Sequence, residues 1–316
     1  MTSDSPQPDR RIDLAARAGW LYYVAGYRQD GIAEHLGVSR QTAQRLVALA
    51  VEEKLVNVRV DHPISRCMEL AGTLRSRYGL CACEVVPSPP NAPDAITGLG
   101  AAGAAVMERE LKVAEPRILA VGTGRALRSC VEELSPMSCP QHRIVALLSH
   151  VGADGSASRY NVGERMAERV DAALYPAWLP IYSRSAEDRE MLQRLDFVKR
   201  HVALARRAAV RFVGIGSIGA DAAMLADGFL SADEVASLQA AGGVGEITGF
   251  VFDREGALLP AGANARVNSV PLAGTGVPVY GVAAGRSKVA AIRGALLGRL
   301  ITGLVTNERT AESLLR

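Results

Sequence analysis

Residues 29–46 place polar side chains at the spacing expected for a helix that reads DNA. Arginine can pair bidentately with guanine, glutamine can pair with adenine, and the methyl group of threonine can contact thymine. We expect these side chains to project from one helix that lies in the major groove. The candidate DNA-binding residues are Gln29, Ser39, Arg40, Gln41, Thr42, Gln44 and Arg45.

Small and apolar residues in the same segment predict a helix-turn-helix around this polar face. Ala33 is small where two helices must cross closely, and Gly37 falls where the turn needs a positive φ. Ser39 is a favourable N-cap for the second helix. The inner face is predicted to contain Ile32, Leu36, Val38, Ala43 and Leu46. An ordinary helical hairpin with a solvated polar face is the alternative.

The apolar segment 14–24 precedes this motif and could complete a three-helix core. Residues 10–59 contain eight Arg and Lys against five Asp and Glu, and they include no polybasic arm. We therefore expect modest phosphate affinity per subunit, and binding to operator DNA as a homotetramer or homodimer.

The length of 316 residues suggests two domains. A break at Asp61-His62-Pro63 predicts a DNA-binding domain over 1–62 and an effector and oligomerisation domain over 63–316. The N-terminus lacks the pattern of a signal peptide and no apolar run is long enough to span a membrane, so a cytoplasmic protein without a membrane partner is expected. The five cysteines and five histidines show no metal-ligand spacing, so neither a metal nor a cofactor is expected.

Beyond residue 80, apolar strand candidates repeatedly run into glycine-rich turns and then helices. The run 118–121 ends at Gly122-Thr123-Gly124-Arg125, and similar turns follow the runs 143–148, 210–214 and 277–282. This alternation predicts an α/β fold: a small N-terminal helical, winged-helix-like domain, followed by a doubly wound, mostly parallel sheet. The turns 122–125, 214–217 and 285–288 should meet at the carboxyl edge of the sheet, where backbone N–H groups can bind an anion.

Several local patterns predict further elements. Residues 56–60 read as a short strand or wing, and a helix should follow Pro63 and end at Gly79. Asn161 and Ser287 are each expected to cap a helix. Lys288 would then lie in the first turn of a helix, a position that is unfavourable for a cation unless an anion offsets the helix dipole.

Two enzymatic functions compete with a binding function. Residues 214–219 match G-x-G-x-x-G, which would suit a nicotinamide-dependent oxidoreductase, but the acids about 20 residues on, Asp233 and Glu234, fall in a predicted helix start. A sugar-phosphate isomerase-like enzyme could use Glu246 and Asp253 for proton transfer. A DNA-reading domain fused to a small-ligand domain needs binding and no turnover, which favours a regulator.

The chain resembles the SorC family of bacterial sugar-binding transcriptional regulators from about Ala15 to Leu315. The resemblance rests on motifs along the chain, among them residues 20–23, 29–40, 122–127, 245–253, 264–266, 285–292 and 304–311. It implies a reader of the winged-helix type, an effector domain similar to sugar-phosphate isomerases without their catalysis, and usually a tetramer. It further implies control of a carbohydrate or polyol catabolic operon by a sugar, a polyol or a sugar phosphate.

The resemblance also implies roles for individual residues. Thr123, Gly124 and Lys288 match phosphate or anion contacts, while Arg159 and Glu246 match positions that touch the sugar. The full set of candidate effector-binding residues is Gly122, Thr123, Gly124, Arg125, Arg159, Asn161, Glu246, Asp253 and Lys288. The chain departs from the usual family pattern at Ala126, Arg286 and Asn307, which favours an effector unlike the better-known sugar phosphates, such as an unphosphorylated polyol.

Overall fold

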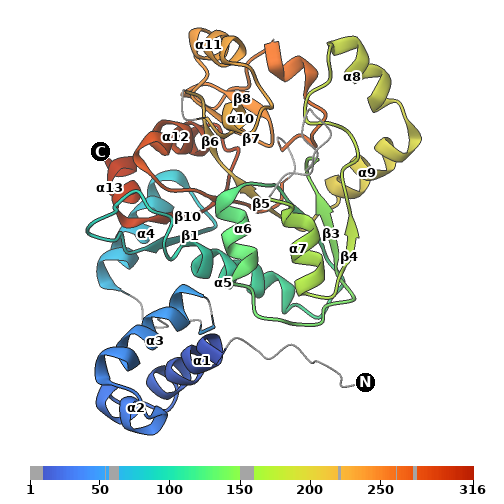
Figure 1. The fold of residues 1–316 in the computed structure, drawn as a ribbon. Helices are drawn as coiled ribbons and strands as arrows, with labels where there is room; N and C mark the ends of the chain where they lie inside the picture. The colour runs from blue at the N-terminus through green and yellow to red at the C-terminus, as the bar shows by residue number, and fades with distance from the viewer. Residues whose placement is uncertain are drawn as a thin grey trace, which may run out of the picture. The chain divides into compact units, whose positions relative to one another are not determined.

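A computed structural model describes residues 10–53, 55–56, 64–149, 160–219, 222–260, 262–272 and 276–316. The chain forms two compact units, residues 1–62 and residues 63–316 (Figure 1). The predicted wing lies outside the described residues, except for Val56. None of the helices within the described ranges has the length and apolar character needed to cross a membrane.

The first unit contains the predicted helix-turn-helix. Its helices are α1 (Arg10–Tyr23), α2 (Gln29–Leu36) and α3 (Arg40–Glu52). Gly37 ends α2 with a φ of 64°, and the Ser39 hydroxyl accepts the Thr42 N–H at 3.1 Å to cap α3. Its core consists mainly of Ala15, Ala18, Leu21, Ile32, Ala33, Ala43, Leu46, Val47 and Ala50. Small alanines at the crossings let the three helices approach closely, a role that the sequence predicted for Ala33.

The second unit is built on a seven-stranded sheet. Its strands are β1 (Ala82–Val86), β2 (Ile118–Val121), β3 (Arg143–Ala146), β4 (Ala173–Tyr175), β5 (Val210–Gly214), β9 (Val279–Val282) and β10 (Gly303–Asn307). The spatial order is β1-β10-β9-β5-β2-β3-β4, and every neighbouring pair is parallel. From β2 the chain adds β3 and β4 on one side of β2, and it then returns to add β5 on the opposite side of β2. The topological switch point therefore lies between β2 and β5.

Helices cover both faces of this sheet (Figure 1). One face packs on α5 (Leu99–Leu111), α6 (Arg125–Glu132) and α7 (Val162–Arg169), through Met107, Leu127 and Met166. The opposite face packs mainly on α4 (Ser65–Tyr78), α9 (Asp196–Arg206), α12 (Val289–Leu297) and α13 (Glu308–Leu315). This arrangement is the doubly wound α/β fold that the alternating sequence pattern predicted.

The first and last strands of the unit are neighbours. β1 pairs with β10 from Ala82 opposite Gly303 to Val86 opposite Asn307. The flanking helices α4 and α13 are also joined, because Tyr78 Oη donates to the Leu314 carbonyl at 3.1 Å and Arg66 pairs with Glu312 at 3.3 Å. The C-terminal segment therefore joins the edge strand β1 and its helix α4 to the rest of the unit.

A small antiparallel sheet lies beside the main one and contains β6 (Gly216–Ser217), β7 (Gly245–Ile247) and β8 (Phe250–Phe252). It is accompanied by α10 (Ala223–Ala226), α11 (Ala232–Ala240) and the 3-10 turn η1 (Gly262–Arg266). Helix α8 (Ala186–Gln193) contacts η1 as well.

The glycine motif at 214–219 does not form a dinucleotide-binding turn. Gly216 and Ser217 form strand β6, where the fingerprint requires the start of a helix. Glu234 is used in a capping box with Ser231 at the start of α11, as the sequence predicted, and its carboxylate also contacts Arg266. The local geometry thus argues against a nicotinamide-dependent oxidoreductase.

One predicted helix cap is confirmed in position only, and another is wrong. Asn161 occupies the N-cap position of α7, but its side-chain oxygen accepts a hydrogen bond from Arg165 Nε at 2.8 Å and makes no capping bond. Ser287 lies inside a 3-10 turn, η2 (Arg286–Lys288), and Lys288 occupies the N-cap position of α12. At Asn161, the Arg165 side chain binds the oxygen that would otherwise cap the helix. At Ser287, a 3-10 turn takes the place of the expected α-helix start.

Candidate functional site: a cavity at the ends of three strands

A cavity of about 660 Å³ lies at the topological switch point of the main sheet. Its walls include segments that follow three adjacent strands: Thr123–Arg125 after β2, Gly214–Gly216 at the end of β5, and Ala284–Lys288 after β9. The carboxyl ends of parallel strands meet at one edge, so segments about 160 residues apart in sequence come together. The three predicted glycine-rich turns therefore do gather at one edge of the sheet.

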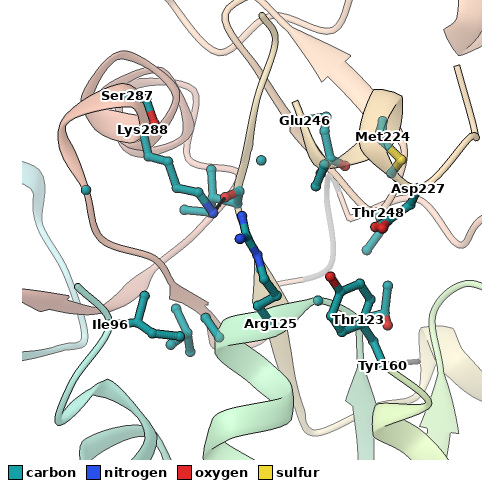
Figure 2. A pocket seen from close by; sticks show the side chains of 18 of the residues that line it. Ile96, Thr123, Arg125, Tyr160, Met224, Asp227, Glu246, Thr248, Ser287 and Lys288 are labelled. Atoms are coloured by element: carbon teal, nitrogen blue, oxygen red, sulfur yellow. Dashed lines mark hydrogen bonds between the residues drawn. The ribbon is translucent and has the colours of Figure 1, made fainter. Parts of the chain in front are cut away.

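The two sides of the cavity differ in chemistry. Figure 2 shows Ser287 and Lys288 entering from one side, and Glu246, Met224, Asp227 and Thr248 from the other. Arg125 extends between them (Figure 2). Cationic and hydroxyl groups thus face carboxylates and hydroxyls across a space large enough for a small polar ligand.

The turn after β9 is held by hydrogen bonds from its backbone to side chains elsewhere in the chain. Gly285 has a φ of 118° and donates its N–H to Thr310 Oγ1 at 2.9 Å, while Arg286 donates its N–H to Asp94 Oδ1 at 2.9 Å. These two backbone donors are already used, which differs from the predicted backbone anion cradle at 285–288. What this turn can offer a ligand is chiefly the side chains of Ser287 and Lys288.

Lys288 is anchored at the end of β5. Its Nζ donates a hydrogen bond to the Ile215 carbonyl at 2.8 Å, and its charge offsets a small part of the rise that burial causes in the pKa of Glu246. A positive charge is therefore fixed at the cavity wall, and a charge-assisted hydrogen bond to a ligand oxygen is within the chemistry of this side chain.

Glu246 is the most deeply buried acidic residue of the cavity wall and is 8% exposed. Its carboxylate accepts the Gly249 N–H at 3.0 Å. A Cβ atom at Gly216 would lie 2.2 Å from Glu246 Oε1, so only glycine leaves room for this carboxyl group. Burial raises the pKa of Glu246, whereas the Gly249 hydrogen bond and Lys288 lower it less strongly.

The Glu246→Gln variant should change how stability depends on pH. The raised pKa means that the folded protein holds a proton more tightly than the unfolded chain. The Glu246 contribution to the free energy of unfolding should therefore grow as pH falls below the raised pKa, and be complete below the ordinary value of 4.5. Glutamine still supplies an oxygen acceptor for Gly249. Urea unfolding between pH 4 and 8 tests this prediction, which fails if wild type and variant differ by a constant amount at every pH.

The structure brings together five of the nine candidate effector residues. The candidates that line the cavity are Thr123, Gly124, Arg125, Glu246 and Lys288. Gly122 is part of the β2 end, where its N–H donates to the Phe212 carbonyl at 2.8 Å. Arg159 lies outside the described residues.

Asn161 and Asp253 have other local roles. Asn161 accepts the hydrogen bond from Arg165 described above. Asp253 Oδ1 accepts the N–H groups of Glu255 and Ala257, at 3.1 and 2.8 Å, and so stabilises the turn after β8. Neither residue is among those that line the cavity.

Several residues of the cavity wall were not predicted from the sequence, including Asp94, Tyr160, Asp227 and Thr248. Gly249 between two short apolar runs signals a hairpin turn, but Thr248 is not a usual residue at its first position. Asp94 and Asp227 reach the cavity only through the packing of distant segments, for which the sequence holds no local signal.

The polar face predicted to read DNA is exposed in the first unit. Arg40, Gln41, Thr42, Gln44 and Arg45 are all exposed on α3, whereas Gln29 is partly buried at the start of α2. Arg40 Nε lies 3.3 Å from Asp30 Oδ1, an exposed ion pair that costs little to break. The side chains predicted to contact bases are thus accessible from one face of the helix-turn-helix.

A helix-turn-helix unit joined in one chain to an α/β unit, with a largely apolar cavity that also carries charged side chains, defines a ligand-responsive transcriptional regulator. Residues 62–316 match the protein family described as "Putative sugar-binding domain". The chain is 34% identical over 308 residues to the Erythritol catabolism regulatory protein EryD of Brucella abortus (strain 2308), covering 97% of this chain and 98% of the relative. It is 33% identical to the Transcriptional regulator LsrR of Enterobacter sp. (strain 638), with 96% and 93% covered.

Solved structures agree with these relatives. The crystal structure of the full-length Sorbitol Operon Regulator SorC from Klebsiella pneumoniae superposes with a TM-score of 0.71 at 28% identity, covering 96% of this chain and 99% of that one. The chain belongs to the SorC family of sugar-binding transcriptional regulators.

Proposed function

We propose that this regulator controls a carbohydrate or polyol catabolic operon, and that a small effector bound in the cavity changes its affinity for operator DNA. The main support for this proposal is the cavity, which brings Arg125, Lys288 and Glu246 together at the carboxyl edge of a parallel sheet. Sugars and polyols present many hydroxyl groups, which can donate to carboxylates and accept from cations. A cavity of this size with a few charged and hydroxyl groups on its wall suits such a ligand.

The effector site that we propose contains Thr123, Gly124, Arg125, Glu246 and Lys288, with Tyr160 and Ser287 beside them. Arg125 and Lys288 would bind an oxygen-rich group, and a phosphate would fit at this cationic side. The name of the relative EryD makes erythritol the first polyol to test. The domain over 63–316 would then serve effector binding and oligomerisation, and the domain over 1–62 DNA binding.

For DNA recognition, we propose that α3 lies in the major groove and that Gln41, Gln44 and Arg45 contact base edges. Ser39 and Thr42, which share a 2.8 Å hydrogen bond, would fix the start of this helix near the phosphates. A cytoplasmic homotetramer or homodimer would place two reading helices on neighbouring half-sites.

A binding function is better supported than an isomerase-like function. Proton transfer next to a carbonyl would need a general base poised beside the reacting carbon, and Asp253, the second proposed carboxylate, is used in a turn outside the cavity. We therefore propose that the protein is not an enzyme. Turnover of a sugar phosphate by the purified protein would contradict this proposal.

Thermal unfolding with a panel of ligands tests the proposed function. The panel comprises erythritol, ribitol, sorbitol and their monophosphates, with sodium phosphate as a control for ion effects. A ligand at about 100 times its Kd should stabilise the protein by about 2.7 kcal/mol, and the same ligand should change the affinity for operator DNA. Arg125→Ala should weaken that ligand by roughly 10- to 100-fold, since a charged hydrogen bond contributes about 1.5–3 kcal/mol. If no member of the panel stabilises the protein, the proposed effector class is wrong.

A matched control uses an arginine outside the cavity. Arg165→Ala removes the same charge at α7, where Arg165 Nε is bonded to Asn161. This variant should bind the ligand like the wild type. Equal weakening by both substitutions would point to a general effect of net charge and would remove Arg125 from the site.

A further inference from the structure

The hairpin between β7 and β8 contains a residue in an unfavourable conformation. Ile247 pairs with Phe250, so the connection consists of Thr248 and Gly249, whose φ values are 51° and 87°. Two consecutive positive φ values are typical of a type I′ turn, whose first position favours asparagine, aspartate or glycine. A β-branched residue there is strained. Threonine at 248 therefore costs stability that a more common turn residue would save.

The Thr248 hydroxyl adds a second cost. The residue is 6% exposed, and its Oγ1 is a buried atom that finds no hydrogen-bond partner within the part of the chain that the structure describes. A buried hydroxyl without a partner is destabilising. Thr248 also lines the cavity, on the same side as Glu246 and Asp227 (Figure 2).

The surrounding contacts hold this turn in place. The Gly249 N–H donates to Glu246 at 3.0 Å, and the Gly249 carbonyl accepts from Tyr182 Oη at 2.7 Å. A Cβ atom on Gly249 would lie 2.9 Å from Ile181 Cγ2, so the backbone is packed closely on that side as well. Both the N–H and the carbonyl of Gly249 are thus hydrogen-bonded, and these bonds hold the neighbouring Thr248 side chain at the cavity wall. Strain and an unsatisfied polar group that persist together at a cavity indicate a functional constraint.

We propose that Thr248 is a specificity-determining residue whose hydroxyl forms a hydrogen bond with an uncharged hydroxyl group of the effector. Glu246 and Asp227, on the same side, would repel a phosphate and accept hydrogen bonds from hydroxyl groups. The polyol end of the effector therefore faces Thr248, and any charged group faces Arg125 and Lys288. This inference rests on the proposed effector function of the cavity.

Two substitutions at one position separate the hydroxyl from the shape of the side chain. Thr248→Val keeps the branched shape and removes the hydroxyl, so it should weaken the panel ligand that the wild type binds by roughly three- to tenfold. Without ligand, Thr248→Val should melt about 2–4 °C higher than the wild type, because the unsatisfied hydroxyl is gone. Thr248→Ser keeps the hydroxyl and should bind within about twofold of the wild type.

Thr306→Val is the matched control. The hydroxyl of Thr306 is also buried without a partner in the described residues, but this residue lies on β10 and is not part of the cavity wall. The control should raise the melting temperature and leave ligand affinity unchanged. Titration calorimetry with the erythritol, ribitol and sorbitol panel measures affinity, and calorimetric unfolding measures stability.

The outcomes distinguish this inference from the proposed function. Ligand binding by the wild type with equal affinity in Thr248→Val would overturn the role of Thr248 and leave the effector site standing. A lower melting temperature for ligand-free Thr248→Val would show that the hydroxyl has a structural partner, and would also overturn the inference. Failure of every panel member to bind the wild type would contradict both proposals.

Discussion

Gly256→Ala is expected to lower the free energy of unfolding by about 2–5 kcal/mol, combining a left-handed backbone cost of about 1–2 kcal/mol with an overpacking cost of about 1–3 kcal/mol. Gly256 has a φ of 82°, and a Cβ atom there would lie 2.3 Å from the Gly294 carbonyl oxygen and 2.6 Å from the Gly298 Cα atom. Both neighbours are backbone atoms of the α12 region, so a side-chain rotation cannot relieve the contact. Urea unfolding monitored by circular dichroism measures the effect.

Gly228→Ala provides the comparison for this prediction. Gly228 has a similar φ of 74°, but a Cβ atom there would meet no heavy atom of the described chain within 4 Å. This variant should lose only the backbone cost, about 1–2 kcal/mol. The difference between the two variants therefore isolates the close packing of the β8 turn on α12. Equal destabilisation would mean that the turn and the helix can move apart at little cost.

Arg45→Ala and Gln41→Ala should each reduce discrimination between specific and random DNA by about 1–3 kcal/mol, or roughly 5- to 150-fold. Both side chains are exposed on α3, so truncation should leave the fold intact. Because the operator is unidentified, the specific probe is a sequence that the wild type selects from a random DNA library. Binding to this probe and to a shuffled duplex, measured at one salt concentration, gives the ratio.

Arg17→Ala is the charge-matched control for the reading helix. Arg17 is exposed on α1 and pairs with Asp13 at 2.8 Å. Its removal should change the ratio of specific to random binding by less than about twofold. Any contact of Arg17 with a phosphate would carry no direct sequence information. If Arg45→Ala and Gln41→Ala select the same sequence as the wild type with unchanged ratios, α3 is not the reading helix.

Local signals explain why much of the fold could be predicted from the sequence. The helix-turn-helix follows from Ala33, Gly37 and Ser39, each of which acts within a few residues of its own position. Four strands of the parallel sheet, β2, β3, β5 and β9, were recognised because short apolar runs end at turns of the chain, whereas β4 and β10 were not. The pairing of β1 with β10 was not foreseen, because residues 82–86 and 303–307 carry no local mark of their partner.

The cavity could be predicted only in part for the same reason. Thr123 and Arg125 follow directly from a strand and turn pattern, and the position of Lys288 follows from another. Asn161 and Asp253 were predicted as effector contacts, but each makes a local hydrogen bond with a nearby residue. Whether a polar side chain serves its own turn or a distant cavity depends on tertiary geometry, which composition and spacing do not encode.

The pairing of β1 with β10 has a consequence for synthesis on the ribosome. Chains emerge from the N-terminal end, and domains generally fold as units in that order. The helix-turn-helix unit has a hydrophobic core of its own and can fold early, whereas β1 must wait for Gly303–Asn307, which form its one neighbouring strand among the described residues of the main sheet. A nascent chain would therefore present a folded helix-turn-helix unit before its cavity is complete, and a product truncated before β10 would carry the exposed face of α3 without a finished second unit.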